Sequence, residues 1–213
     1  MSLIVSEGST GGKAYDPAPA GASVARCIKI VDLGTQKREY NGEVKHQKQV
    51  MFTWELPEEL IPDGDLAGQP FAINQIYTQS LSPKSNLRKD LESWRGRPFS
   101  QAELDNFDLE NVLGKPCMLN IVHNTRGDRT YANIASIMPL PSKMTCPEQI
   151  NPSVMFSLSA FDAAQYEALT KWTKEKIALS PEYAEAASGA QDRIDTPDGG
   201  VMNVDPDNED IPF

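Results

Sequence analysis

The sequence predicts a mainly β fold in which five strands carry one helix between the third strand and the fourth. Three observations support this prediction. Two β-rich stretches flank the dipeptide Asn41-Gly42, the strongest short-range signal for a hairpin. A helical pattern follows a third strand-like stretch, and two more strand-like stretches follow that helix. The 213 residues suffice for one domain of ordinary size plus tails.

The first two strands are expected to form a long, twisted hairpin. The first covers 24–33 and 37–40, with a bulge or bend at Gly34. The second covers 45–56 and alternates, with one apolar face made of Val50, Phe52, Trp54 and Leu56. The tip of this hairpin is polar and basic, with Lys37, Arg38, Lys45, His46 and Lys48.

The next segment predicts a third strand and its helix. Residues 71–80 are strand-like, and a helix over 86–94 aligns Leu87, Leu91 and Trp94 in one apolar stripe. A second short helix is expected to start at Ser100, where Glu103 completes a capping box.

The remaining elements are two strands and one amphipathic helix. The strands are expected at 117–123 and 129–137, joined by a turn, and the helix at 160–179. Strand, strand, strand, helix, strand, strand is the element order of an OB-fold, a five-stranded, partly open Greek-key barrel.

The chain divides into four parts on this reading. The boundaries are a flexible N-terminal arm at 1–22, an OB-fold domain at 23–141, a linker with the C-terminal amphipathic helix at 142–180, and a disordered acidic tail at 181–213.

The charge is concentrated in the tail. The whole chain has a formal net charge of −10, and residues 181–213 hold nine acids and one base. The 21 acids and 19 bases upstream leave a nearly neutral body. A neutral body can still bear a basic face, so nucleic-acid binding is not excluded.

Neither a metal site, a cofactor nor a membrane segment is expected. The three cysteines, Cys27, Cys117 and Cys146, are far apart, and the two histidines have no ligand spacing to them. No signal peptide or apolar run of spanning length is present, so a cytoplasmic protein is expected.

No enzyme motif occurs either: a nucleophile elbow, a Walker A loop, a dinucleotide fingerprint and H-E-x-x-H are all missing. We therefore expect no catalysis, and His123 is interpreted as a structural histidine.

The last nine residues combine an acidic run with an apolar end. Their carboxylates and the terminal tripeptide are Asp205, Asp207, Glu209, Asp210, Ile211, Pro212 and Phe213. A terminal aromatic after a stiffening proline suits capture by a pocket with a nearby cation. An acidic C-terminus that only aids solubility is the alternative. This tip resembles the C-terminal peptide of bacterial single-stranded DNA-binding proteins, which recruits replication and repair proteins.

The middle of the chain carries a second resemblance. Residues 81–104, 107–109 and 113–117 are similar to a segment of small replication-associated proteins of tailed bacteriophages, which are read as single-stranded DNA-binding proteins. The likeness spans roughly 73–139. It implies an OB-fold protein of the host-cell cytoplasm that acts in DNA replication, recombination or repair. Its partners would be single-stranded DNA and a polymerase, helicase, exonuclease or recombinase. The oligomeric state is left open, with a homo-oligomer as one option.

Single-stranded DNA is bound by cations that follow the phosphates and by aromatic faces that stack on bases. Candidates on the predicted strands and loops are Lys29, Arg38, Tyr40, Lys45, Lys48, Trp54, Tyr77, Lys84, Arg88, Arg126, Arg129 and Tyr131. Phe52 and Trp54 could instead lie in the core, and each cation alone is more often an ordinary surface charge. Two rival functions remain. The first is a protein-interaction adaptor on an OB-like barrel, which the nearly neutral body favours. The second is a nuclease, which would need a carboxylate cluster for Mg²⁺ that the predicted strands do not supply.

Overall fold

The structure is a computed structural model that describes residues 16–40 and 42–194. Most of the expected N-terminal arm and the whole acidic tip at 205–213 therefore lie outside the described residues. The expected arm ends earlier than predicted, because the first strand already begins at Gly21.

The core of the fold is a six-stranded sheet. The path of hydrogen-bonded neighbours is β3-β2-β1-β4-β5, antiparallel throughout, and β6 pairs parallel with β1. The strands are β1 (Gly21–Tyr40), β2 (Glu43–Leu60), β3 (Pro70–Thr78), β4 (Pro116–Arg126), β5 (Arg129–Met138) and β6 (Val154–Phe156). The prediction of a mainly β fold is confirmed. Over the described residues the path runs as an open sheet, without β3–β5 pairing that would close a barrel.

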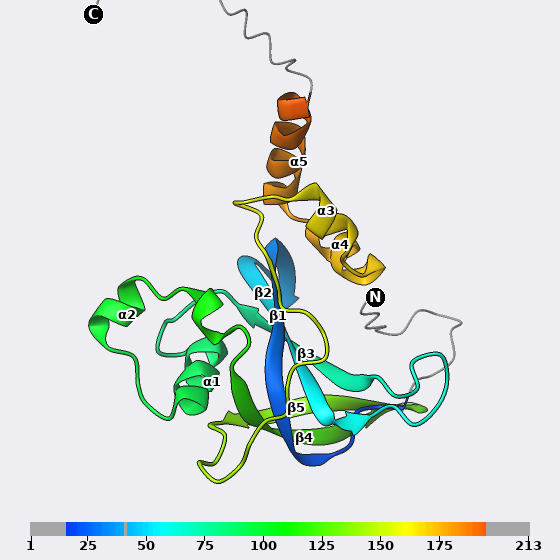
Figure 1. Ribbon diagram of the computed structural model, residues 1–213. Helices are drawn as coiled ribbons and strands as arrows, with labels where there is room; N and C mark the ends of the chain where they lie inside the picture. The colour runs from blue at the N-terminus through cyan, green and yellow to red at the C-terminus, as the bar shows by residue number, and fades with distance from the viewer. Residues whose placement is uncertain (1–15, 41, 195–213) are drawn as a thin grey trace, which may run out of the picture.

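In the part of the chain that the structure describes, five α-helices and a 3₁₀ turn accompany the sheet. They are α1 (Asn86–Arg95), α2 (Gln101–Asp105), the 3₁₀ turn η1 (Leu109–Val112), α3 (Ala163–Glu167), α4 (Lys171–Ala178) and α5 (Pro181–Ile194). The predicted capping box is present, since Ser100 accepts from the Glu103 backbone N–H and the Glu103 side chain bonds back. Figure 1 shows α1 and α2 beside the sheet and α3, α4 and α5 together near the far end of β1 and β2.

The C-terminal part differs from its prediction in two places. The single helix expected at 160–179 is wrong, because Thr170 is extended (ψ 153°) and its side chain caps a new helix, α4. The irregular tail expected from 181 is wrong up to residue 194. Pro181 opens α5 rather than ending structure, since proline is well tolerated in the first turn of a helix. The short strand β6 was not anticipated in what was read as coil and linker.

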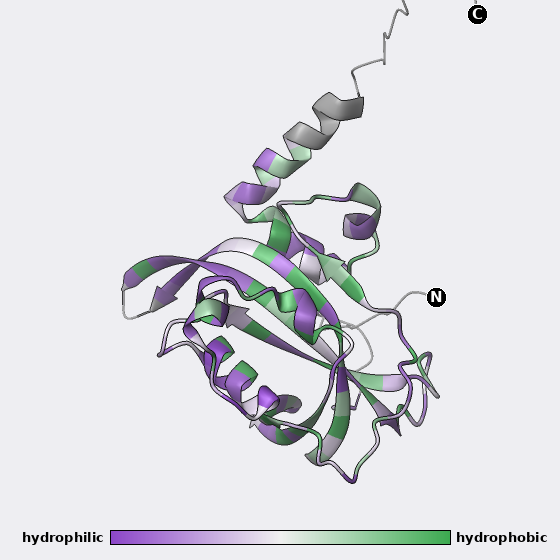
Figure 2. Cartoon of the chain, turned by 60° about the vertical axis from the view of Figure 1, so that its left-hand side comes forward, coloured by the Kyte–Doolittle hydropathy of each residue, from purple (hydrophilic) through white to green (hydrophobic). Residues whose placement is uncertain are grey.

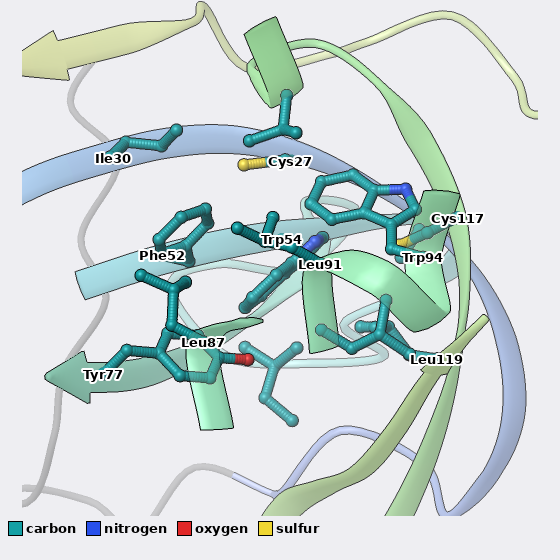
Figure 3. Close-up of a cluster of buried hydrophobic side chains, with 14 of the residues drawn as sticks. Cys27, Ile30, Phe52, Trp54, Tyr77, Leu87, Leu91, Trp94, Cys117 and Leu119 are labelled. Carbon is teal, nitrogen blue, oxygen red and sulfur yellow. The ribbon is translucent and has the colours of Figure 1, made fainter. Parts of the chain in front are cut away.

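Two hydrophobic cores lie on opposite faces of the β1–β2 pair. The inner core, closed by α1, contains Phe52, Trp54 and Trp94 (Figure 3). The outer core lies under α3, α4 and α5 and contains Leu33, Met51, Phe156, Tyr166 and Ile177 among its members. Every residue of β2 from Val50 to Leu56 is therefore buried, where the sequence pattern indicated one apolar face and one open face.

Gly34 lets the outer layer approach β1. It lies at a bulge, with φ 66°, and its backbone N–H donates to the Asp32 carboxylate at 2.9 Å. A Cβ built there would lie 2.5 Å from the Cβ of Ser180 and 2.9 Å from Cδ1 of Leu158. The bend predicted from Gly34 is thus also a point of close approach between β1 and Ser180, which immediately precedes α5.

Replacing Gly34 by alanine is expected to destabilise the chain more than replacing Gly42. Both glycines have positive φ, where a Cβ costs about 1–2 kcal/mol. Only Gly34 is crowded; nothing lies within 4 Å of a Cβ at Gly42. Urea unfolding should show G34A losing about 1–3 kcal/mol more than G42A, the range for overpacking. Equal losses would mean that the C-terminal layer does not rest on β1 at this point.

Candidate nucleic-acid interface

Three of the residues predicted to bind DNA are buried, which is a correction. Trp54 is 1% exposed and Tyr77 is 4% exposed. Trp54 packs against Phe52 and Trp94 at centroid separations of 5.6 and 6.0 Å (Figure 3). Lys29 is 7% exposed and lies on the outer face under α4. The inner core covers Trp54 and Tyr77, and the C-terminal layer covers most of Lys29, so none of the three belongs to an exposed binding surface.

Tyr77 has a structural partner as well. Its hydroxyl donates to the Asp90 carboxylate of α1 at 2.8 Å. Burial and the neighbouring Asp90 charge raise the pKa of Tyr77 well above its ordinary value. Burial also raises the pKa of Asp90, partly offset by the Tyr77 hydrogen bond. This pair ties β3 to the helix that closes the inner core.

Some of the basic side chains near α1 are hydrogen-bonded to other groups of the chain, and one is exposed. Arg88 donates to Glu92 one turn on at 2.9 Å and to the Leu81 carbonyl at 3.3 Å, so its guanidinium is partly committed. Lys84 is exposed in the loop before α1. Arg97 and Arg95 bind the Glu103 carboxylate, which lowers the pKa of Glu103. Those two arginines hold the end of α1 against α2.

The outer part of the β1–β2 hairpin is exposed and mostly hydrophilic (Figure 2). Arg38 lies directly opposite Lys45 in the register. Like charges facing each other across a strand pair destabilise it, and Glu43 offsets part of this through an ion pair with Lys45 at 3.1 Å. Lys48 lies 4.0 Å from Glu182 of α5. The side chain of Tyr40 lies outside what the structure describes.

The far end of the β4–β5 pair forms a second exposed ribbon. Residues 122–131 are all exposed, and β1 pairs with β4 only as far as Ile121. Within the ribbon, Arg126 lies opposite Arg129, and Asn124 lies opposite Tyr131. Directly opposite residues share a face, as do residues two apart along a strand. The two arginines, Tyr131 and Asn124 therefore share one face, which we call the ribbon face; it also includes Val122 and Asn133.

The ribbon face combines the three kinds of group that a single strand requires. Two guanidinium groups suit phosphates, Tyr131 is 43% exposed with a ring that can stack, and the Asn124 amide can bond to base edges. The Asn133 amide donates to the Tyr131 backbone carbonyl at 3.2 Å. Asn124 and Asn133 were missed in the sequence reading. The signal that identifies them is the tight turn at Gly127-Asp128, since it fixes which residues of the two strands are opposite.

The hairpin cations and the ribbon face lie far apart. Gly21 at the start of β1 pairs with Ile121, next to the ribbon, whereas the hairpin tip is at the other end of this 20-residue strand. The 20 residues of β1 are joined by nineteen steps of about 3.3 Å, so the contour length of the strand is roughly 60 Å. Figure 1 likewise shows the β4–β5 pair away from the α3–α5 end of β1. The predicted single basic surface is therefore two separate clusters.

Comparison with known proteins leaves the family open. No protein-family model matches the chain. Similar curated proteins include the porins MspA and MspB of Mycolicibacterium smegmatis, each 30% identical over 78 residues. The match covers 32% of this chain and 37% and 36% of these two porins, so the chain spans about a third of their length. A likeness of this extent shows no family.

Three further features of the described residues concern membranes, metal ions and the buried thiol of Cys27. Among residues 16–40 and 42–194, no helix combines the length and the apolar character needed to cross a membrane. The same part of the chain contains no group of three His, Cys, Asp or Glu side chains placed to hold a metal ion. Burial raises the pKa of the Cys27 thiol to about 12, which leaves it protonated and unreactive at neutral pH.

Asp90 is expected to make stability fall as pH rises. Its raised folded-state pKa means that the folded chain keeps a proton that the unfolded chain loses near pH 3.9. By linkage, the free energy of unfolding then decreases as pH rises through the folded-state pKa. D90N removes this titration and keeps an acceptor for Tyr77. Urea unfolding from about pH 4 to pH 7 should show the wild type losing stability relative to D90N. A constant difference would mean that the pKa of Asp90 is the same in the folded and the unfolded chain.

Proposed function

We propose that the chain binds single-stranded DNA without sequence preference and that the ribbon face of β4–β5 is its main contact. The observation that carries the proposal is the shared, exposed face of Arg126, Arg129 and Tyr131 at a strand-pair end. Cations would follow the phosphates while the ring stacks on a base.

The arrangement of the elements supports an OB-fold for this function. The sheet order β3-β2-β1-β4-β5 and the position of α1 between β3 and β4 agree with that fold. In OB-folds the loop between the fourth and fifth strands is one of the usual binding loops. The ribbon face lies at that loop.

The proposal extends to the phage-type role suggested by the sequence. The exposed hairpin cations Arg38, Lys45 and Lys48 would form a secondary contact for a longer strand. Residues 205–213 would dock a replication or recombination partner through the acidic run and Ile-Pro-Phe. These residues lie outside the described part, so the sequence alone supports this step.

Tyr131→Ala is expected to weaken binding to single-stranded DNA. Base–aromatic stacking contributes about 1–3 kcal/mol per base, which is roughly a 5- to 150-fold loss of affinity. Tyr131→Phe should retain most of the affinity, because the ring does the stacking. Thr130→Ala is the matched control, since Thr130 is the next residue along β5 and points to the opposite face. An equal loss in T130A would contradict the assignment to the ribbon face.

The salt dependence tests the electrostatic part. Fluorescence anisotropy of a labelled oligo-dT of about thirty nucleotides should show binding that falls with salt, by about 0.7 in logarithmic slope per phosphate neutralised. The double variant R126A/R129A should flatten this slope by about 1.4. The exposed, charge-matched pair K115A/K143A should keep it.

Two further arms complete this experiment. A duplex of the same length should bind more weakly than the single strand. A chain lacking 205–213 should bind equally or more tightly, because the removed segment is a polyanion, while capture of a partner protein is lost. Absence of single-strand binding at low salt would refute the proposal and favour the adaptor reading.

A further inference from the structure

The edge of β4 that faces β1 is unpaired over residues 122–126. β1 pairs with this edge only as far as Ile121, which lies opposite Gly21 at the start of β1, and no other described strand pairs with β4 on that side. All five residues of the stretch are exposed. The stretch contains neither lysine nor proline, two residues that commonly protect a free edge from pairing. This edge can therefore accept a further strand.

The free backbone groups of this edge belong to His123 and Thr125. In an antiparallel pair, successive residues direct their backbone groups alternately toward the partner strand and away from it. Arg126 and Arg129 close the two-residue turn as a hydrogen-bonded pair, and Asn124 therefore also directs its backbone groups toward β5. The N–H and C=O groups of His123 and Thr125 then point to the unpaired side.

The N-terminal end of the described chain lies at the same place. His123 donates through Nε2 to the carbonyl oxygen of Ala18 at 2.8 Å, so the main chain passes beside β4 only two residues after Asp16. Ala18 is buried and belongs to the inner core, which fixes this point of the chain. Residues 1–15 therefore join the described fold close to His123 and the unpaired edge.

The sequence upstream contains one short apolar stretch of strand-forming residues. Residues 3–5 are Leu-Ile-Val, in a segment otherwise rich in glycine and serine, and isoleucine and valine favour strands. In a strand, the first and third of these residues would share one face with Glu7. Two apolar side chains followed by an acid are complementary to the ribbon face of β4, where the exposed Val122 precedes Arg126. The two sequences match when they run in the same direction.

The connecting chain is long enough for this stretch to reach the edge. Ten residues, 8–17, separate Glu7 from Ala18, and a glycine-rich chain of that length has a root-mean-square span of about 16–19 Å. Arg126 lies three residues beyond His123, which is about 10 Å along the strand. A segment tethered in this way has an effective concentration of about a millimolar. A five-residue edge, by contrast, offers a second copy of the chain much less contact than the roughly 1,200–2,000 Å² of a stable interface.

We propose that residues 3–7 add to the free edge of β4 as a strand parallel to it, with Glu7 beside Arg126. The backbone of the added strand bonds to the two outward-facing residues of β4, and the side chains at positions 3 and 5 cover Val122. The added strand also closes an edge that would otherwise be open to pairing with other chains. This docking goes beyond the proposed function and does not depend on DNA binding.

Amide hydrogen exchange of the full chain, followed residue by residue by NMR, tests the added strand. The amide protons of His123 and Thr125 should exchange at least about tenfold more slowly in the wild type than in the triple variant L3S/I4S/V5S, because a hydrogen-bonded amide exchanges only after local opening. The Asn124 amide bonds to β5 in both proteins and is the internal reference. Equal exchange of His123 and Thr125 in the two proteins would overturn the proposal.

Two further variants and a dilution complete the test. L179S is the matched control, because it removes another exposed apolar side chain, outside β4, and it should exchange as the wild type does. E7K should lower the protection of both edge amides, since it places a cation beside Arg126. Dilution of the wild type by about tenfold should leave the protection unchanged, because the contact is intramolecular. Protection that falls on dilution, as pairing with a second copy requires, would refute the docking, and so would an equal loss in L179S or unchanged protection in E7K.

Discussion

The burial of strand β2 on both faces is the constraint on which the rest of the structure depends. Phe52 and Trp54 face the inner core, while Met51, Thr53 and Glu55 face the outer layer. Polar groups on a covered face must be hydrogen-bonded, because an unpaired buried polar group costs free energy. Thr53 is paired with Asn74, and Glu55 accepts backbone and side-chain hydrogen bonds from the linker before β6. These bonds hold the C-terminal segment over the sheet.

This covering determines where a ligand can reach the sheet. The middle of β1–β2–β3 is closed on one side by α1 and on the other by the C-terminal helices, so Trp54 and Tyr77 serve as core residues. The strand-pair ends project beyond both layers and remain exposed: the tip of β1–β2 and the tip of β4–β5. Under α4 the outer layer covers all but 7% of the surface of Lys29. The exposed cations and the exposed ring of Tyr131 therefore lie at the margins of the sheet and not at its centre.

Local sequence signals identified most elements but not their burial. The signals for the β1–β2 hairpin, the Leu87–Leu91–Trp94 stripe and the Ser100 capping box each act within a few residues. The hairpin pairing, the helix and the capping box appear where they were expected. The second covering of β2 comes from residues about a hundred positions later, which no local pattern encodes. The same long-range packing explains why Lys29 was read as a surface cation. Thr170 was interpreted as a residue inside a helix, although threonine is also a common N-cap. Pro181 was interpreted as the end of a helix, although proline is also common in the first turn.

The sequence by itself determined the mainly β class, the helix between the third and fourth strands and the exposed, basic character of both strand-pair tips. These follow from periodicity, turn chemistry and charge, which operate over short distances along the chain. Only the tertiary structure decided which aromatics are core, that the cations form two clusters, and that a lysine lies beneath a helix N-terminus. Those facts depend on strand register and on which layer covers which face, since a side chain's surroundings are set by segments distant in sequence.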